Sequence, residues 1–413
     1  MKCNLYPSTI KGKIKAVPSK SFAHRIIIMA SFKKGKTIVK NVGYSDDVLS
    51  TIACMQKLGA NIQRKKDNLI IYGIEKPNKN AILDFNESGS TMRFLIPVVS
   101  ALGTGATFTG KQSLLRRPND DLYASLKSNG VNVENCVISG KIAGGEITIN
   151  AGTSSQFVSG LIMAATILDR DYKINLVGNV VSKNYIDITL QVLSNFGVKY
   201  SVNGNSIVIF KSKIKSKRKI EVEGDWSSAS FMLALGVLGK KIKVCGLNMK
   251  SKQGDKAILD IIKKMGGKLK TGNKSVTAYN SKLKAIEYDV ENCPDLAPIL
   301  SVLMLTSKEE CKMKGVERLR IKESDRLNAI IDNLTLAGGQ VEYKDKCLYI
   351  SARQLQQADF NGYNDHRMVM SSVVLSSILK GASSVTDKEA VKKSYPNFFN
   401  DYIKLGGKID VNV

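Results

Sequence analysis

A dense run of charged residues has a composition suited to acid–base chemistry. In Arg318-Leu-Arg-Ile-Lys-Glu-Ser-Asp-Arg326, Glu323 stands between lysine and arginine side chains. Flanking cations can hold a carboxylate at a chosen protonation state, which proton transfer requires. The same run is also compatible with a capping box and surface ion pairs. Asp295 before the run and Asp365-His-Arg367 after it favour the chemical interpretation.

Several basic residues stand at the predicted starts of apolar helices. Lys20, Ser21 and Arg25 open one such helix, and Arg93 lies near the start of another. A helix N-terminus carries free N–H groups and a partial positive charge, so it favours anions. Ser21 is predicted to be an N-cap. Arg25 and Arg93 each lie one turn inside an apolar helix, where a buried guanidinium needs an anion. The sequence therefore predicts binding of anionic substrates.

These polar helix openings recur at a regular interval. Their markers stand 65 to 72 residues apart: Ser21, Ser90, Ser155, Ser227, Asp295 and Asp365. A second series, in which a glycine ends an amphipathic segment before a short alternating strand, has steps of 67 to 72 residues: Gly59, Gly130, Gly197, Gly266, Gly338 and Gly406. Glycine after a helix is the usual left-handed cap, and alternation indicates a strand. We therefore expect an α/β protein with six repeats of strand, apolar helix, strand, amphipathic helix, strand and strand (βαβαββ).

Six repeats are too many for one hydrophobic core, so three repeats in each of two domains is the economical division. The predicted domains are residues 14–224, and residues 1–13 together with 225–413. Helices that are apolar nearly all round must be buried, so we expect helices inside and strands outside in each domain. If the polar helix ends of the two domains face each other, the active site lies in the cleft between them.

Composition narrows the functional classes. The chain has 413 residues and a formal charge of +26, which suits nucleic acid, a membrane surface or anionic small molecules. Aromatic residues make up only 7%, which disfavours a stacking surface for nucleic acid. Seven scattered cysteines and two histidines form no metal-ligand pattern and suggest reduced thiols. With no signal-peptide core and no membrane-spanning run, we expect a cytoplasmic protein without a metal.

The chain resembles the EPSP synthase (3-phosphoshikimate 1-carboxyvinyltransferase) family from Lys11 to Phe399. The most specific matching motifs are Lys322-Glu-Ser-Asp-Arg326 and Asp365-His-Arg-Met368. Further matching segments are Pro18 to Ser21 with Arg25, Glu87 to Arg93, Arg117-Pro118, Ser154 to Gln156, Ser182 to Tyr185, Asp225 to Ser230, Cys293 to Pro298, Tyr363-Asn364 and Lys393. The resemblance implies a two-domain inside-out α/β barrel. It also implies transfer of the enolpyruvyl group of phosphoenolpyruvate to the 5-hydroxyl of shikimate 3-phosphate, in the shikimate pathway, without a metal or organic cofactor.

The resemblance also implies roles for individual residues. Asp295 would accept the proton of the 5-hydroxyl, Glu323 would protonate the methylene carbon and later remove a proton, and Lys20 would assist proton transfer. The residues implied to hold shikimate 3-phosphate are Lys20, Ser21, Arg25, Ser154, Ser155, Gln156, Ser182, Asp295, Arg318 and Lys322. Those implied to hold phosphoenolpyruvate are Lys20, Gly89, Arg117, Gln156, Arg326, Arg367 and Lys393.

Two positions depart from the family pattern, because Glu87 replaces the usual Asn and Arg318 stands where some members have Asn. A carboxylate at position 87 must point away from the substrate phosphate, pair with a cation, or weaken binding. The nearest alternative is the UDP-N-acetylglucosamine enolpyruvyl transferase, which has the same fold. That enzyme has a cysteine on the loop matching Lys111 to Asn119 and Lys-Asn in its first motif, whereas this chain has neither. We expect a monomer that acts on small molecules and binds neither nucleic acid nor membrane.

Overall fold

The computed structural model describes residues 1–215 and 218–410. They form two compact units, an N-terminal unit of Pro18–Glu223 and a C-terminal unit of Met1–Val17 with Gly224–Val413. The sequence had placed the two crossings between units at residues 13/14 and 224/225. In the structure the first crossing follows Val17 instead of residue 13. The reason is that strand β2 (Lys11–Lys15) pairs over its full length with β15 (Lys241–Cys245) of the C-terminal unit.

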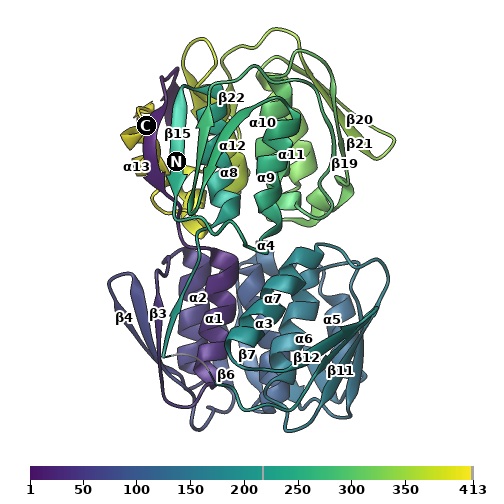
Figure 1. Ribbon diagram of the computed structural model, residues 1–413. Helices are drawn as coiled ribbons and strands as arrows, with labels where there is room; N and C mark the ends of the chain where they lie inside the picture. Colours follow the sequence, from purple (N-terminus) through teal and green to yellow (C-terminus); the bar gives the residue numbers. More distant parts are fainter. Residues whose placement is uncertain (216–217, 411–413) are drawn as a thin grey trace. The chain divides into compact units, whose positions relative to one another are not determined.

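Helices lie inside and strands outside in the N-terminal unit (Figure 1). Its helices are α1 (Lys20–Phe32), α2 (Asp46–Lys57), α3 (Gly89–Leu102), α4 (Gln112–Leu115), α5 (Asp120–Lys127), α6 (Ser155–Ala165) and α7 (Lys183–Asn195). Its strands are β3 (Lys36–Lys40), β4 (Asn61–Lys65), β5 (Asn68–Tyr72), β6 (Ala81–Asp84), β7 (Ala106–Thr109), β8 (Val131–Glu134), β9 (Val137–Gly140), β10 (Glu146–Asn150), β11 (Tyr172–Val177), β12 (Tyr200–Asn203), β13 (Ser206–Ile209) and β14 (Lys219–Glu221). The sheet orders are β14-β3-β5-β4, β6-β7-β9-β8 and β10-β11-β13-β12.

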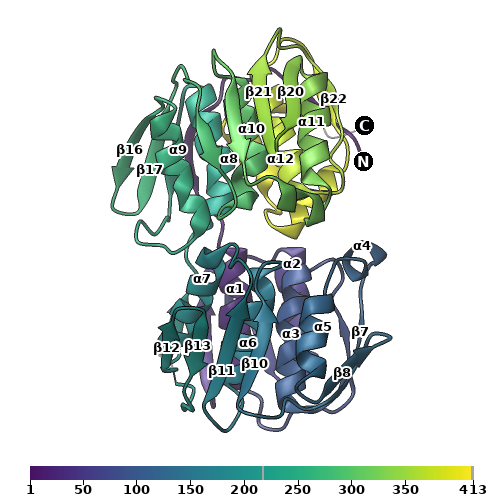
Figure 2. The same ribbon diagram turned by 90° about the vertical axis from the view of Figure 1, so that its right-hand side faces the viewer.

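The C-terminal unit has the same layering (Figure 2). Its helices are α8 (Trp226–Leu238), α9 (Ile258–Lys264), α10 (Ala297–Leu305), α11 (Arg326–Leu336), α12 (His366–Ser376) and α13 (Phe398–Lys404), with short 3-10 turns η1 (Gly254–Ala257), η2 (Pro294–Leu296), η3 (Glu317–Ile321) and η4 (Lys388–Lys393). Besides β2 and β15, its strands are β1 (Cys3–Tyr6), β16 (Lys268–Gly272), β17 (Ser275–Tyr279), β18 (Glu287–Asp289), β19 (Cys311–Lys314), β20 (Gly339–Lys344), β21 (Cys347–Ala352), β22 (Asp359–Phe360), β23 (Ser383–Val385) and β24 (Lys408–Asp410). The sheet orders are β16-β17-β15-β2, β18-β19-β21-β20 and β22-β23-β1-β24.

The predicted βαβαββ repeat is confirmed, and the strand pairing refines it in three repeats. Strand β14 precedes α8 in the chain but pairs in parallel with β3 of the N-terminal unit. Strand β2 precedes α1 but pairs in parallel with β15 of the C-terminal unit. Strand β1, at the start of the chain, completes the last sheet between β23 and β24. The two units therefore exchange first strands at the two crossings.

The apolar helices are buried as expected, and most of them begin with a side-chain cap. Ser88, Ser154, Asp225 and Asp365 each accept a hydrogen bond from a main-chain N–H in the first turn of the helix that follows. The prediction that Ser21 caps α1 is wrong, because α1 begins at Lys20 and Ser21 lies within its first turn. All six glycines predicted to end amphipathic segments have positive φ.

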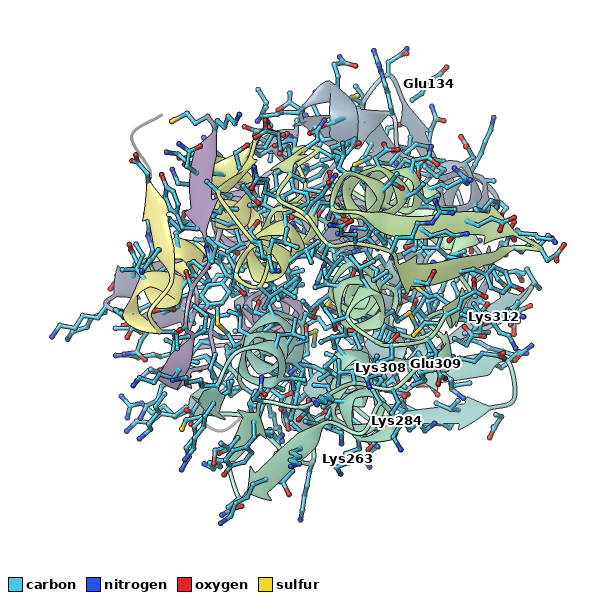
Figure 3. All side chains as sticks on the ribbon, turned by 90° about the horizontal axis from the view of Figure 1, so that it is seen from above. Glu134, Lys263, Lys284, Lys308, Glu309 and Lys312 are labelled. Carbon is cyan, nitrogen blue, oxygen red and sulfur yellow. The ribbon has the colours of Figure 1, made fainter. Side chains whose placement is uncertain are left out.

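The outer surface carries most of the lysines. Lys263, Lys284 and Lys308 are exposed and project from the C-terminal unit in Figure 3. Within the described part of the chain, no helix is both long and apolar enough to cross a membrane.

Candidate active site

At the N-terminus of α1, Lys20 has a carboxylate partner. Its Nζ lies 2.6 Å from Asp47 Oδ2 on α2, and both side chains are mostly buried. Asp47 was missed by the sequence interpretation, because an acidic residue in the first turn of a helix is ordinary. The ion pair holds the ammonium group at the start of α1, where an anion can compete with Asp47 for it.

Arg25, one turn further along α1, is buried without any carboxylate among its partners in the described residues. Its Nε donates to Thr189 Oγ1 at 2.7 Å, and its Nη2 donates to Ser159 Oγ at 3.1 Å. Nη1 donates to the main-chain oxygen of Ser21 at 2.7 Å, and the guanidinium lies 4.7 Å from the ring centroid of Phe94. Burial lowers the pKa of Arg25 to about 9. Neutral oxygens thus hold the cation but leave its charge available for an anion.

A second buried arginine, Arg93, orients the predicted ligand Gln156. Arg93 Nη1 donates to Gln156 Oε1 at 2.9 Å, and Gln156 Nε2 donates to Ser90 Oγ at 2.9 Å. A Cβ added to Gly89 would lie 3.0 Å from Arg117 Nη1 and 4.0 Å from Gln156 Oε1. The structure therefore brings together Gly89, Arg117 and Gln156, and the glycine leaves room beside the guanidinium.

The predicted serines lie at the starts of two other helices of this unit. Ser154 Oγ accepts from the main-chain N–H of Gln156 at 3.3 Å, and Ser155 is buried beside it. Ser182, which precedes α7, has φ +50°, a left-handed conformation that strains a non-glycine residue and often marks a functional site. Glu87, which replaces the Asn usual in the family, forms an ion pair in which Lys111 Nζ lies 3.3 Å from Glu87 Oε1. Of the three options left open for this carboxylate, the structure therefore shows pairing with a cation.

In the C-terminal unit, Asp295 is held between two arginines. Arg326 Nη1 lies 2.8 Å from Asp295 Oδ1, and Arg367 Nη2 lies 2.9 Å from Oδ2. Arg367 Nη1 also donates to the main-chain oxygen of Asp295 at 3.2 Å. Burial raises the pKa of Asp295, but the charges of Arg367, Lys322 and Arg326 outweigh it and leave the pKa far below its ordinary value. Asp295 is therefore ionised.

Arg326 connects Asp295 to two further carboxylates. Its Nη2 lies 2.6 Å from Glu323 Oε2, and its Nε lies 2.7 Å from Asp365 Oδ2. Arg326 and Asp365 are both fully buried. Asp365 also accepts from the main-chain N–H of Arg367 at 2.9 Å, so one carboxylate caps α12 and fixes Arg326. Asp365 was singled out in the sequence as a helix opener, but its bond to Arg326 has no local signal.

The remaining predicted residues of this unit surround the same network or lie at its edge. Lys322 is half-buried, and burial lowers its pKa to about 8 although Asp295 opposes the shift. Burial likewise lowers the pKa of Arg318, whose charge acts on Lys322. Lys393 Nζ donates to the main-chain oxygen of Asn364 at 2.6 Å. The direct contacts of this unit therefore join Asp295, Glu323, Arg326 and Arg367.

Comparisons with known proteins identify the family and the fold. The family model of EPSP synthase (3-phosphoshikimate 1-carboxyvinyltransferase) matches residues 6–402. The chain is 37% identical over 412 residues to a Clostridium perfringens protein named 3-phosphoshikimate 1-carboxyvinyltransferase, covering 97% of each chain. It is 36% identical to a Clostridioides difficile protein of the same name, covering 98% of each. In fold it is similar to EPSP synthase from Acinetobacter baumannii, with a TM-score of 0.84, 21% identity and 99% of each chain covered. It is also similar to the enolpyruvyl transferase NikO from Streptomyces tendae, with a TM-score of 0.79, 13% identity and 99% and 98% covered.

Proposed function

The chain belongs to the EPSP synthase (3-phosphoshikimate 1-carboxyvinyltransferase) family, and we propose that it performs the family's reaction with the two groups of side chains described above. The enzyme transfers the enolpyruvyl group of phosphoenolpyruvate to the 5-hydroxyl of shikimate 3-phosphate and releases phosphate. The observation that carries the assignment of residues is the position of Asp295 between Arg326 and Arg367.

The N-terminal unit supplies cations for the substrate phosphates and carboxylates. Shikimate 3-phosphate is held by Lys20, Ser21, Arg25, Ser154, Ser155, Gln156 and Ser182, together with Asp295, Arg318 and Lys322 of the other unit. Arg25 supports this role, because its partners are uncharged and its positive charge is not neutralised. Phosphoenolpyruvate is held by Lys20, Gly89, Arg117 and Gln156, together with Arg326, Arg367 and Lys393.

The C-terminal unit carries out the proton transfers. Asp295 takes the proton of the 5-hydroxyl while the hydroxyl oxygen of shikimate 3-phosphate bonds to the enol carbon. Glu323 protonates the methylene carbon, which gives a tetrahedral intermediate. Glu323 then removes a proton from that carbon as the bond to phosphate breaks, and the departing phosphate takes up the proton held by Asp295, with Lys20 assisting proton transfer. Anions of phosphoenolpyruvate compete with Asp295 for Arg326 and Arg367, which raises the pKa of Asp295 and makes it a stronger proton acceptor.

The test is phosphate release from the purified chain with both substrates, compared with Asp295→Ala and Glu323→Ala. Release that requires both substrates and is lost in each variant supports the assignment. Asp260→Ala, which removes an exposed carboxylate from α9 of the same unit, is the matched control and should release phosphate at the wild-type rate. Release with UDP-N-acetylglucosamine in place of shikimate 3-phosphate would contradict the substrate assignment.

We also propose a cytoplasmic monomer that binds neither nucleic acid nor membrane. The seven cysteines are free thiols, as is usual for proteins of a reducing compartment. Sedimentation at micromolar concentration tests the monomer, and a salt-dependent mobility shift with bulk RNA would contradict the absence of nucleic-acid binding.

A further inference from the structure

A second buried carboxyl group lies near Asp295 and has no part in the mechanism above. Asp255 belongs to η1 and is 2% exposed. Both η1 and η2, which carries Asp295, pack against α8. The two 3-10 turns that carry Asp255 and Asp295 therefore both contact the buried helix α8.

The position of Asp255 is fixed from α8. Ser227 Oγ, in the first turn of α8, donates a hydrogen bond to Asp255 Oδ2. Gln253, two residues before Asp255, accepts from the main-chain N–H of Trp226 at 3.0 Å and donates to the main-chain oxygen of Gly224 at 2.9 Å. These bonds hold η1 against the start of α8, so the Asp255 side chain has little freedom to turn away.

The surroundings of Asp255 differ from those of Asp295. Among the described residues, Asp255 has no lysine or arginine within ion-pair distance, and its buried Oδ1 has no hydrogen-bond partner. Asp295, by contrast, has Arg326 and Arg367. A buried polar atom without a partner is costly, so its presence calls for a role beyond packing.

The charges around Asp255 come from several elements. Asp295 of η2 and Asp225 before α8 are negative, whereas Arg367 of α12 is positive. Cys293, which precedes η2, faces the same group as a neutral thiol, since burial and the charge of Asp255 raise its pKa to about 12. Burial and the negative charge of Asp295 raise the pKa of Asp255 to about 7, although Arg367 and the Ser227 hydrogen bond oppose this. Asp255 therefore changes charge near neutral pH while Asp295 stays ionised.

We propose that Asp255 is a positioning residue for the enolpyruvyl transfer, which places a further negative charge close to Asp295. Once substrate anions draw the arginines from Asp295, the ionised Asp255 repels the charge of Asp295 and strengthens it as a proton acceptor. When Asp255 is protonated, Asp295 remains a weaker acceptor. This inference rests on the proposed role of Asp295.

The first test is the pH profile of kcat for wild type and Asp255→Asn, from pH 5.5 to 9, at saturating concentrations of both substrates. In wild type, kcat should rise with pH at or above about pH 7, because substrate anions and the withdrawal of Arg367 raise the pKa that Asp255 has in the free chain. The variant should lack this rise and have about ten-fold lower kcat at pH 8, with both KM values changed less than about three-fold. A purely structural role would change the amount of active enzyme but not the shape of the profile.

Ser227→Ala is the second variant, and Asp401→Asn is the control. Removing the Ser227 hydroxyl removes a bond to the ionised form of Asp255, so the rise in kcat should move to higher pH. Asp401 is also a buried carboxylate and accepts from Tyr395 Oη at 2.9 Å, far along the chain on α13. Its variant should keep the wild-type profile, because it removes a buried charge that does not act on Asp295.

Stability provides a readout besides activity. The pKa of Asp255 is about 7 in the folded chain and 3.8 in its ordinary state, so the folded protein binds more protons and loses stability as pH rises between these values. Asp255→Asn removes this loss, and its urea midpoint relative to wild type should increase from pH 5 to pH 8. An Asp255→Asn enzyme with the wild-type kcat profile would overturn this inference alone. A wild-type chain that releases no phosphate from the two substrates would overturn the proposed function and this inference with it.

Discussion

The buried arginines of the two units have different kinds of hydrogen-bond partner. In the N-terminal unit, Arg25 is bonded to hydroxyl and main-chain oxygens, and Arg93 to amide and main-chain oxygens. In the C-terminal unit, Arg326 contacts three carboxylates and Arg367 contacts Asp295. The contacts of Arg25 leave its positive charge for a ligand, whereas Arg326 and Arg367 hold the pKa of Asp295 below its ordinary value. These contacts fit the proposed division of roles, in which the N-terminal unit mainly binds anions and the C-terminal unit supplies the carboxylates for proton transfer.

The largest expected effect is the loss of the Asp295 charge. Asp295→Asn keeps the shape of the side chain but removes its charge and one of its two acceptors, so it cannot accept the hydroxyl proton and kcat should fall about 10³-fold. Substrate dissociation constants measured by calorimetry should change only a few-fold, since binding rests mainly on cations of both units. A variant with near wild-type kcat would place the proton acceptor elsewhere.

Replacing a buried arginine should lower the free energy of unfolding much more in the C-terminal unit than in the N-terminal unit. Arg326→Met leaves Asp295, Glu323 and Asp365 without their shared cation, so the free energy of unfolding should fall by about 3–5 kcal/mol. Arg25→Met strands no carboxylate, and Thr189 Oγ1 still donates to Ser159 Oγ at 2.8 Å. Its stability should therefore change little, while KM for shikimate 3-phosphate rises by about 100-fold.

Urea denaturation of both variants at one pH checks this contrast. Equal loss of stability in Arg25→Met and Arg326→Met would show that the carboxylate partners do not distinguish the units. An unchanged KM for shikimate 3-phosphate in Arg25→Met would separately remove Arg25 from the anion site.

The sequence predicted the elements of both sites better than their partners. Asp295 and Arg367 were predicted because polar motifs recur at the starts of apolar helices, and Arg326 because it ends a dense charged run that matches a family motif. Arg25 and its partner Thr189 are 164 positions apart, so no local pattern links them. The predicted domain bounds placed β14 and most of β2 in the units where they pair, but their partners β3 and β15 could not be predicted, since an alternating strand has the same pattern in any sheet. Asp255 was missed because an aspartate at the start of a helix usually needs no other explanation.

A third expected effect is a fall of kcat/KM at alkaline pH, caused by a residue of the C-terminal unit. Lys322 has a pKa of about 8 because burial disfavours its charge. The cationic form is needed to bind an anionic substrate, so kcat/KM should fall above pH 8, by about ten-fold per pH unit. In the complex, the substrate anion favours the charged lysine, and the limit in kcat should move to higher pH.

Lys322→Arg should move the alkaline limit of kcat/KM upward, because a guanidinium stays charged through this range. Lys284→Arg, an exposed substitution in the same unit, should leave the profile unchanged. A limit near pH 8 that persists in Lys322→Arg would have to come from another group.

The smallest expected effect concerns Glu87, a carboxylate in the otherwise cationic N-terminal site. Glu87 lies two residues before Gly89, and its pair with Lys111 neutralises a cation that a phosphate could use. Glu87→Asn keeps the approximate shape of the side chain, removes its charge and frees Lys111. Because Lys111 is largely exposed, water and salt screen the gain, and KM for phosphoenolpyruvate should fall only about two- to three-fold.

Salt dependence shows whether this effect is electrostatic. If it is, the difference in KM between Glu87→Asn and wild type should shrink at high ionic strength, whereas Glu134→Gln, an exposed substitution on β8, should show no difference at any salt concentration. A rise in KM for Glu87→Asn at all salt concentrations would mean that the pair positions the loop bearing Lys111. The N-terminal unit would then also depend on a carboxylate for its geometry, and the division of roles between the two units would be less sharp than the arginine contacts indicate.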